Sequence, residues 1–400
     1  MKAQFLESIS QISLDDWQRL NTSTCPFLHY EFFKALEQST SASLKKGWQP
    51  HHLLLSHDEN NDIKSNNVEK NALKNHNLGN HSLENHKVEA IMPMYLKSHS
   101  WGEYVFDWDW AEAYQKNNLS YYPKLVATLP FTPVTSEKLL SNKFQTFDFF
   151  DVLSEHCQHQ SINSWHMLFC PQVASEQLPE NVYQRHTVQF QWFNKNYQSF
   201  DQYLDTFVAR KRKNTKKERH SITQQGINVR QILGRNITAV ELEFFYLTYQ
   251  LTYLKRGHTP HLTLAFFQQI IITMADNILL VIANHQEKDV ACALFFYDNK
   301  QLYGRYWGCT EPFNNLHFEL CYYQGIEFCI ANGLQSFHSG TQGEHKIQRG
   351  FEPILTYSYH WIKHPAFKAA IKNFCQQEQQ HMLAYQQQCQ LALPFRTSNE

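Results

Sequence analysis

Hydrophobic residues recur along the chain at two spacings, which divide it into helical and strand segments. Apolar residues every three or four positions predict helices, whereas alternating or continuous apolar runs predict strands. The predicted helices cover residues 14–20, 30–38, 147–153, 200–207, 210–225, 240–254, 262–274, 318–330 and 366–391, and the predicted strands cover 51–55, 88–96, 165–170, 189–193, 227–232, 279–284, 290–297, 301–307, 334–339 and 355–361. This mixture predicts an α/β (α+β) fold with mixed sheets flanked by helices.

A chain of 400 residues is too long for one compact core. A capped helix begins after the strand 189–193, so we place a domain boundary there. We expect an N-terminal domain at 1–190, a C-terminal domain at 191–365 and a helical tail at 366–400. Residues 57–87 lack large apolar side chains and contain a loose repeat, KNHNLGNHSLENHKVE. We interpret them as a solvated low-complexity insertion in the first domain, with a histidine metal site as the alternative.

Composition excludes several classes of protein. Hydrophobic residues make up 42% of the chain, which can fill its cores, and a net charge of -1 gives no global attraction to nucleic acid or anionic membranes. The nine cysteines are scattered without a Cys-x-x-Cys pair, as in reduced cytosolic proteins. The N-terminus lacks a signal peptide, and polar residues interrupt the most apolar stretch, 262–283. We therefore expect a cytoplasmic protein with no membrane insertion.

Seven cations crowd residues 210–219, within the sequence RKRKNTKKERHSITQQGINVR. Arg212, Lys216 and Arg219 are spaced to share one helix face, where like charges repel one another. Two explanations fit: a solvated helix face, or a site for an anion such as phosphate, which would offset the repulsion. The acceptor end of a tRNA is one such ligand, although no standard RNA-binding signature accompanies the cations. The donor-binding candidates are Arg210, Arg212, Lys213 and Lys216.

The richest polar cluster, GTQGEHK followed two residues later by RGF, lies between the last two predicted strands. Its glycines allow the backbone to turn tightly and to approach a ligand. Either Glu344 or His345 can take a proton as a base. Gln342, Lys346 and Arg349 can bind a phosphate or a carboxylate. The alternative is a surface hairpin in which Lys346 pairs with Glu344.

A second cluster, His317 and Glu319 at the start of a predicted helix, follows the strand that carries Arg305. Glu319 in the first turn can simply stabilise the helix dipole. Alternatively, Glu319 acts as a base while His317 and Arg305 clamp a substrate. With Glu344 and His345, these residue types also suit zinc or iron, but the His-x-x-x-His spacing is missing, so we predict no metal.

The aromatic segment EYVFDWDWAEAY, residues 103–114, places carboxylates among aromatic side chains. Such a mixture suits a cleft for a glycan or an amine, and it equally suits core aromatics beside solvated acids. Asp107 and Trp108 are the candidate substrate ligands. Lys97 and Lys124 would add an anion-binding rim.

Several sequence blocks resemble one bacterial family. The matching blocks are PFLHYEFFKALEQS, GWQPHHLLL, PMYLKSHSWGEYVFDWDWAEAY, YYPKLVATLPFTPVT, LYGRYWGC, and HFELCYYQGIEFCIANGL through GTQGEHKIQRGFEPILTYSYHW. They span most of the chain in order, and they resemble predicted N-acyltransferases that are labelled peptidoglycan biosynthesis or recognition proteins. The basic helix, with Asn214 and the following QQGINVR, resembles the corresponding segment of FemAB-type aminoacyl transferases.

The resemblance implies two tandem GNAT-like domains and transfer of an acyl or aminoacyl group to an amine, on a small molecule or a cell-wall precursor. The donor would be an acyl-CoA or an aminoacyl-tRNA acting as co-substrate, with no tightly bound cofactor, and Asn214 would join the donor-binding residues. The usual acetyl-CoA loop, Gln/Arg-x-x-Gly-x-Gly/Ala, is missing from the sequence. A second function therefore stays open, namely a non-catalytic protein of this fold that binds a peptidoglycan precursor or a nucleotide.

Overall fold

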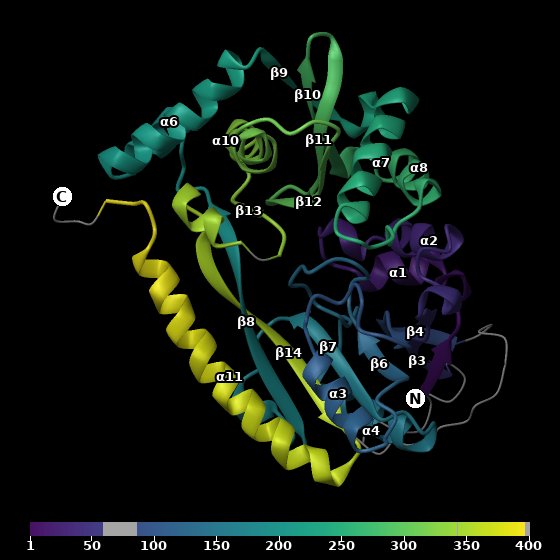
Figure 1. Ribbon diagram of the computed structural model, residues 1–400. Coiled ribbons are helices and arrows are strands. Elements are labelled where there is room, and N and C mark those ends of the chain that lie inside the picture. Colours follow the sequence, from purple (N-terminus) through teal and green to yellow (C-terminus); the bar gives the residue numbers. More distant parts are fainter. Residues whose placement is uncertain (59–85, 342, 397–400) are drawn as a thin grey trace. The chain divides into compact units, whose positions relative to one another are not determined.

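The computed structural model describes residues 1–58, 86–341 and 343–396, which form two compact units. Unit 1 contains Met1–Ser23, Phe27–Thr187 and Thr356–Gln380, and unit 2 contains Thr24–Pro26, Val188–Leu355 and His381–Glu400. The chain passes from one unit to the other within two long strands and within its last helix (Figure 1).

Unit 1 has two sheets. Its elements are β1 (Lys2–Leu6), α1 (Leu14–Leu20), α2 (Tyr30–Gln38), β2 (Trp48–Pro50), β3 (His52–Asp58), β4 (His86–Met92), β5 (Tyr95–Lys97), α3 (Trp108–Lys116), β6 (Lys124–Ala127), α4 (Phe150–His159), β7 (Ser164–Cys170), the start of β8 (Val182–Phe193), most of β14 (Glu352–Ile362) and the start of α11 (Pro365–Leu391). Strand β3 lies between β1 and β4 in an antiparallel sheet. In the second sheet the order is β2-β5-β6-β7-β14, where β6 and β7 are parallel and the other neighbours are antiparallel.

The core of unit 1 lies between these strands and α4. All seven residues of β7, SWHMLFC, are buried, as in a mostly apolar strand covered on both faces. Trp165 and Met167 of β7 pack in one cluster with Phe150 and Leu153 of α4.

Unit 2 is built around one mixed sheet. Its elements are the end of β8, α5 (Phe200–Asp205), α6 (Ala209–Gln224), β9 (Ile227–Leu233), α7 (Ala239–Leu254), α8 (Leu264–Thr273), β10 (Ile278–His285), β11 (Lys288–Tyr297), β12 (Gln301–Cys309), α9 (Leu316–Phe318), the π-helical segment η10 (Glu319–Tyr323), α10 (Gln324–Ala331), β13 (Ser336–His338), the 3-10 helix η11 (Glu344–Arg349) and the end of α11. The strand order is β8-β13-β12-β11-β10-β9, with β12 and β13 parallel and the other neighbours antiparallel.

Helices cover both faces of the unit 2 sheet. Alternate residues of a strand point to opposite faces. Leu279 and Val281 of β10 pack in one cluster with Ile326 of α10. On the other face, the thiol of Cys292 in β11 lies 3.1 Å from the hydroxyl of Thr248 in α7. Figure 1 accordingly shows α10 on one side of β10–β12, with α7 and α8 on the other.

The mixed α/β fold with flanking helices is confirmed, and several elements differ from their predicted ranges. The predicted strand 88–96 is two strands, β4 and β5, because Pro93 interrupts it. The predicted helix 318–330 begins with a π turn. Of the predicted insertion 57–87, residues 59–85 lie outside the described residues, while β3 and β4 reach into its two ends. None of the helices within the described ranges is long and apolar enough to cross a membrane.

Candidate functional site

The predicted glycine-rich site forms the short helix η11 in unit 2. Gly343 precedes η11 with a φ of 139° and Gly350 follows it with a φ of 75°, conformations that L-residues rarely adopt. A Cβ at Gly350 would lie 2.1 Å from the hydroxyl of Tyr203, which donates a 2.6 Å hydrogen bond to the carbonyl of Arg349. The two glycines therefore fix where η11 begins and ends.

The side chain of Lys346 is buried by η11 and is only 2% exposed. Its Nζ donates hydrogen bonds to the carbonyl of Gly340, at 3.2 Å, and to the carbonyl of Thr341. Burial lowers the pKa of this amine to about 7. Within the described ranges, no carboxylate forms an ion pair with it. Lys346 is therefore a buried amine without a counter-charge, and an anionic ligand would favour its protonated form.

Two histidines share this positive environment. Burial, followed by electrostatic interactions with His345, Lys346, Arg349 and Arg256, lowers the pKa of His317 to about 4. Burial, then Lys346 and Arg349, also lower the pKa of His345. Both imidazoles are therefore neutral at pH 7, so each retains a nitrogen that can accept a proton.

A third histidine and an arginine extend the cluster. His338 ends β13, and its Nε2 lies 2.8 Å from the side-chain oxygen of Gln189. Burial lowers the pKa of His338 to about 3, and the charges of Arg305 and Lys346 contribute in the same direction. Arg305, on β12, thus lies close enough to add to the positive potential around Lys346.

Aromatic side chains line the same cluster. The guanidinium of Arg349 lies 3.4 Å from the ring centroid of Phe318, and the ring of His317 meets that of Trp307 edge-on at 5.2 Å. The hydroxyl of Tyr322 lies 2.8 Å from Nε2 of His345. Burial raises the pKa of Tyr322, so its hydroxyl stays protonated, and its oxygen can accept a hydrogen bond from Nε2–H of His345, which leaves Nδ1 as the basic nitrogen. The cations and imidazoles therefore lie in partly apolar surroundings, which strengthen electrostatic interactions.

The inward face of the basic helix α6 is bonded to η11 and η10. Lys211 donates to the side chain of Gln348. Glu218 accepts two hydrogen bonds, of 2.9 and 2.8 Å, from Nη2 of Arg349. Arg219 donates to Glu319 at 2.9 and 3.1 Å. The structure thus brings the basic segment and the glycine-rich segment together.

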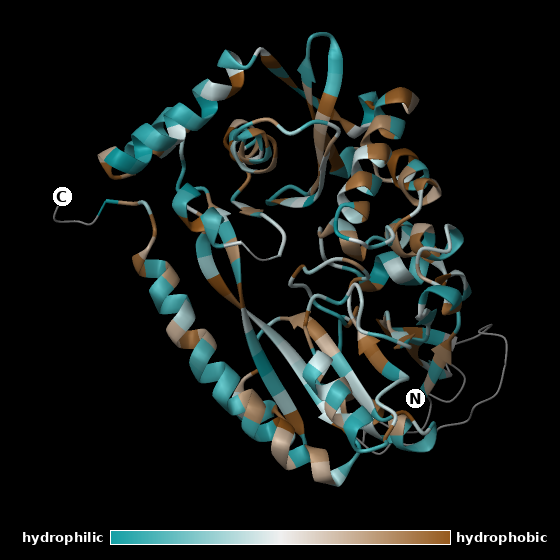
Figure 2. Cartoon of the chain, viewed as in Figure 1, coloured by the Kyte–Doolittle hydropathy of each residue, from teal (hydrophilic) through white to brown (hydrophobic). Residues whose placement is uncertain are grey.

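On the outward face of α6, two of the cations considered for an anion site already have carboxylate partners. Arg212 pairs with Asp205 at 3.1 Å and Lys216 pairs with Asp201 at 2.8 Å, so carboxylates of the preceding helix α5 already offset two of these charges. The remaining candidates, Arg210, Lys213 and Asn214, are exposed. Figure 2 shows the resulting hydrophilic colour along most of α6.

The two carboxylates considered as bases are both engaged. Glu319 accepts hydrogen bonds from Arg219 and, at 2.8 Å, from the amide of Gln324. Glu344 is exposed and accepts a 2.9 Å hydrogen bond from the hydroxyl of Tyr385 on α11. Gln342 lies outside the described residues. Among the residues that the structure describes, no group of three or more His, Cys, Asp or Glu is arranged to hold a metal ion.

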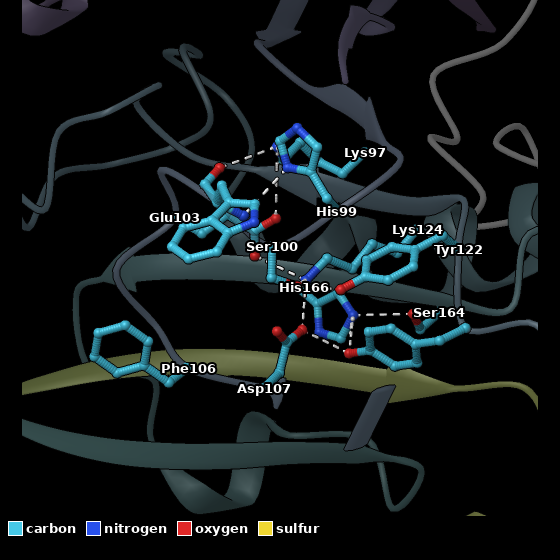
Figure 3. Close-up of polar contacts among 12 residues, drawn as sticks. Lys97, His99, Ser100, Glu103, Phe106, Asp107, Tyr122, Lys124, Ser164 and His166 are labelled. Atoms are coloured by element: carbon cyan, nitrogen blue, oxygen red, sulfur yellow. Dashed lines mark hydrogen bonds and ion pairs between the residues drawn. The ribbon is translucent and has the colours of Figure 1, made fainter. Parts of the chain in front are cut away.

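In unit 1, Asp107 lies in a buried charged cluster (Figure 3). Lys124 donates to Glu103 at 2.8 Å and to Asp107, and Asp107 also accepts a 2.6 Å hydrogen bond from the hydroxyl of Tyr121. The fourth member, Lys97, lies 3.9 Å from Glu103. The anion-binding rim expected of Lys97 and Lys124 is therefore wrong, because both side chains are 0% exposed and face carboxylates.

Burial and charge act in opposite directions within this cluster. Burial raises the pKa of Glu103 to about 7 and lowers the pKa of Lys97 to about 7. Although burial opposes it, Lys124 lowers the pKa of Asp107 far below its usual value. Trp108, next to Asp107, is exposed and stacks at a tilt on Trp101, with centroids 5.0 Å apart.

Sequence reasoning missed two members of the unit 2 site. Glu218 is the single acid within the basic run, and that isolated position among the cations was the available signal. His338 lies in a short strand, and nothing in its sequence context indicated that Lys346 and Arg305 would be its neighbours.

Comparison with solved structures gives weak similarities. A conserved protein of unknown function from Bacteroides thetaiotaomicron is 11% identical, with a TM-score of 0.47 over 90% of this chain and 99% of that chain. FemX is 10% identical, with a TM-score of 0.45 over 83% and 92%. A tandem GNAT protein from the clavulanic acid biosynthesis pathway is 8% identical, with a TM-score of 0.43 over 91% and 98%. No curated protein matches the chain.

A family model gives the decisive match. The FemAB-like family, described as peptidoglycan biosynthesis/recognition, matches residues 8–397. This range covers nearly the whole chain and includes η11, α6 and the buried cluster of unit 1, which confirms the resemblance in the sequence blocks. The chain belongs to the FemAB-like family.

Proposed function

We propose that the protein is an N-acyltransferase in which the cluster around Lys346 binds the anionic part of an activated donor and stabilises the reaction's oxyanion. The observation that carries this proposal is the burial of Lys346 without a carboxylate partner among the described residues. A structural lysine in such a position would be expected to have a counter-ion. A lysine that receives negative charge from a ligand needs none.

The side chains of this cluster can provide what acyl transfer to an amine requires, namely a hydrogen-bond donor for the oxyanion and a base. The lone pair of the acceptor nitrogen attacks the donor carbonyl, which forms the C–N bond and leaves an alkoxide on the former carbonyl oxygen. Protonated Lys346 can donate a hydrogen bond to that oxyanion. Collapse of the intermediate breaks the C–O or C–S bond to the leaving group. The proton lost by the amine passes to the leaving group through a base.

His345 is our candidate for that base. Its ring is neutral at pH 7, and the hydroxyl of Tyr322 orients it. Arg349 is a positioning residue, because its ion pair with Glu218 ties η11 to α6. We assign Arg305 and His317 to binding of the donor or the acceptor. Direct transfer needs no covalent enzyme intermediate, since holding the reactants together supplies much of the rate enhancement.

The test is an acyl-transfer assay with acyl-CoAs and aminoacyl-tRNAs as donors and amines, including cell-wall precursors, as acceptors. Lys346→Met should lower the rate by about 100-fold or more, in line with loss of one oxyanion donor. Lys346→Arg should keep part of the activity. Lys300→Met, at an exposed position of the same unit, is the matched control. Equal rates for Lys346→Met and this control would remove Lys346 from the mechanism.

The salt dependence of donor affinity can distinguish an aminoacyl-tRNA donor from an acyl-CoA donor. The exposed residues Arg210, Lys213 and Asn214 suit the phosphates of a tRNA, for which affinity falls steeply as salt rises. An acyl-CoA carries few phosphates and should show a shallow dependence. We place the protein in the cytoplasm, where both donor classes are made, because none of its nine cysteines, all within the described residues, forms a disulfide.

A second function rests on the engagement of Glu319 and Glu344. Both carboxylates already accept hydrogen bonds from protein groups, and a protein that only binds a peptidoglycan precursor or a nucleotide needs no base. Stabilisation by such a ligand, without turnover of any donor, would favour this binding function.

A further inference from the structure

Helix α7 presents an apolar stripe to solvent. Its members follow spacings of four, three, four and three residues; they are Val240, Phe244, Leu247, Leu251 and Leu254. Val240 is 75% exposed, Leu247 is 47% exposed and Leu254 is 61% exposed. A helix on the surface of a globular unit ordinarily carries polar residues on this face. The apolar segments of α7 are visible in Figure 2, in contrast with α6.

The stripe is separate from the face that α7 uses to pack on its own unit. Leu242, Phe245 and Tyr249 are buried and lie on the opposite side of the helix. Phe245 and Tyr249 meet the ring of Phe267 on α8 at 4.9 and 5.3 Å. The folding of unit 2 therefore accounts for one apolar face of α7 and leaves the other without a covering element.

A spacing of four and three residues is the pattern of helices that pair along a seam. The helix is firmly defined at its start, where Thr238 and Glu241 form a capping box. Its sixteen residues give a seam of about 24 Å, roughly two heptads. The stripe therefore fits the side of another helix of similar length.

Charges at the two ends of α7 select the partner and its direction. The exposed Glu243 lies in the first turns beside the stripe and the exposed Lys255 lies at the C-terminal end, whereas Glu241 already pairs with Arg230 at 3.4 Å. A second α7 running antiparallel would bring the acidic end of each helix to the basic end of the other. A parallel pair would join like charges. The helix dipoles also favour the antiparallel arrangement.

We infer that α7 pairs antiparallel with α7 of a second copy of this chain, with Leu247 of each copy at the two-fold axis. The interface is isologous, so Val240 of one copy meets Leu254 of the other. A seam of this length is small for a permanent dimer, so we expect reversible association in the micromolar range. This inference does not depend on the proposed transferase activity.

Analytical ultracentrifugation of the full chain over a range of micromolar concentrations tests the inference. The wild-type protein should shift from monomer to dimer, and Leu247→Glu should weaken dimerisation by about tenfold or more. Ile272→Glu is the matched control, because Ile272 is 80% exposed on α8 and outside the stripe. Circular dichroism checks that each variant keeps its helices. A monomeric wild-type protein, or a Leu247→Glu dimer of unchanged affinity, would overturn the inference.

A charge variant tests the direction of pairing. Lys255→Glu should weaken the dimer by adding a carboxylate beside the partner's acidic end, and adding Glu243→Lys should restore part of the affinity. Flotation with anionic phosphatidylglycerol vesicles tests the competing occupant of an exposed apolar stripe, a lipid surface. Vesicle binding that Leu247→Glu abolishes, from a protein that stays monomeric, would replace the second copy by a membrane.

Discussion

Both units bury lysine side chains, but they compensate the charges differently. In unit 1, Lys124 donates to two buried carboxylates, Glu103 and Asp107, and the four charged residues of that cluster balance. In unit 2, Lys346 meets two backbone carbonyls and, within the described ranges, no carboxylate. The first arrangement is complete without a ligand. The second has no such internal counter-charge, which is why we propose that an anionic donor binds there.

The largest expected effect is on the stability of unit 1. Lys124→Met removes the cation between Glu103 and Asp107 and leaves two buried carboxylates together, which should lower the free energy of unfolding by about 3–5 kcal/mol. Urea unfolding followed by circular dichroism measures it. The control is Lys116→Met, which breaks an exposed pair with Glu112 and should cost at most about 0.5 kcal/mol. If both variants lowered the free energy of unfolding by similar amounts, burial would not be what makes the Lys124 ion pairs important for stability.

In contrast, Lys346→Met should increase the free energy of unfolding. Its replacement by an apolar side chain removes an uncompensated buried amine, so at pH 7 or below the free energy of unfolding should rise by a few kcal/mol. Between pH 7 and about pH 10 the unfolded wild-type chain holds more protons at this site than the folded chain, so wild-type stability rises there with pH. The gain from Lys346→Met should therefore shrink across that range. If Lys346→Met lowered the free energy of unfolding at pH 6, the view that Lys346 is a buried charge without compensation would be wrong.

Anion binding should depend on the protonation of Lys346. Because its pKa in the free protein is about 7, affinity for an anionic donor or for inorganic phosphate should fall as pH rises above 7. Isothermal titration calorimetry at several pH values measures this fall. Lys346→Arg keeps its charge at all these pH values, so its affinity should change much less. A wild-type affinity that is constant from about pH 6 to about pH 9 would exclude a titrating Lys346 from the binding site.

The smallest effect is expected on the outer face of α6. Lys213→Ala removes an exposed charge and should change the free energy of unfolding by no more than about 0.5 kcal/mol. If this face contacts tRNA phosphates, the same variant should reduce the slope of log affinity against log salt by about one. Filter binding over a salt series gives that slope, and Lys300→Ala provides the control. An unchanged slope would remove Lys213 from the donor contacts.

Much of the fold could be predicted because it depends on local patterns. The mostly apolar sequence of β7 and the capped start of α5 at Ser199 are properties of neighbouring residues. Strand β1, strand β6 and helix α3 were missed. Their short sequences mix apolar and polar residues, and pairing or packing with distant segments decides their conformation.

The candidate site was harder to predict because charge partners are distant in sequence. Residue types alone identified Lys346 and His345, but not that Lys346 would lack a counter-ion. The same limitation led us to expect Lys97 and Lys124 at an anion-binding rim, since the carboxylates of residues 103–114, their partners Glu103 and Asp107 among them, had been interpreted as lining a substrate cleft or as solvated acids. Burial of a charge and the identity of its partner are tertiary properties, and a single sequence gives little access to them.

The passage of the chain between the units, within β8, β14 and α11, limits how the protein can be dissected. A fragment ending at Thr187 would lack Thr356–Gln380, which contributes a strand and half of a long helix to unit 1. A fragment beginning at Val188 would carry that same segment without the sheet neighbour β7. Neither half can be expressed intact by a single truncation, so isolating either unit requires joining segments that are remote in the gene.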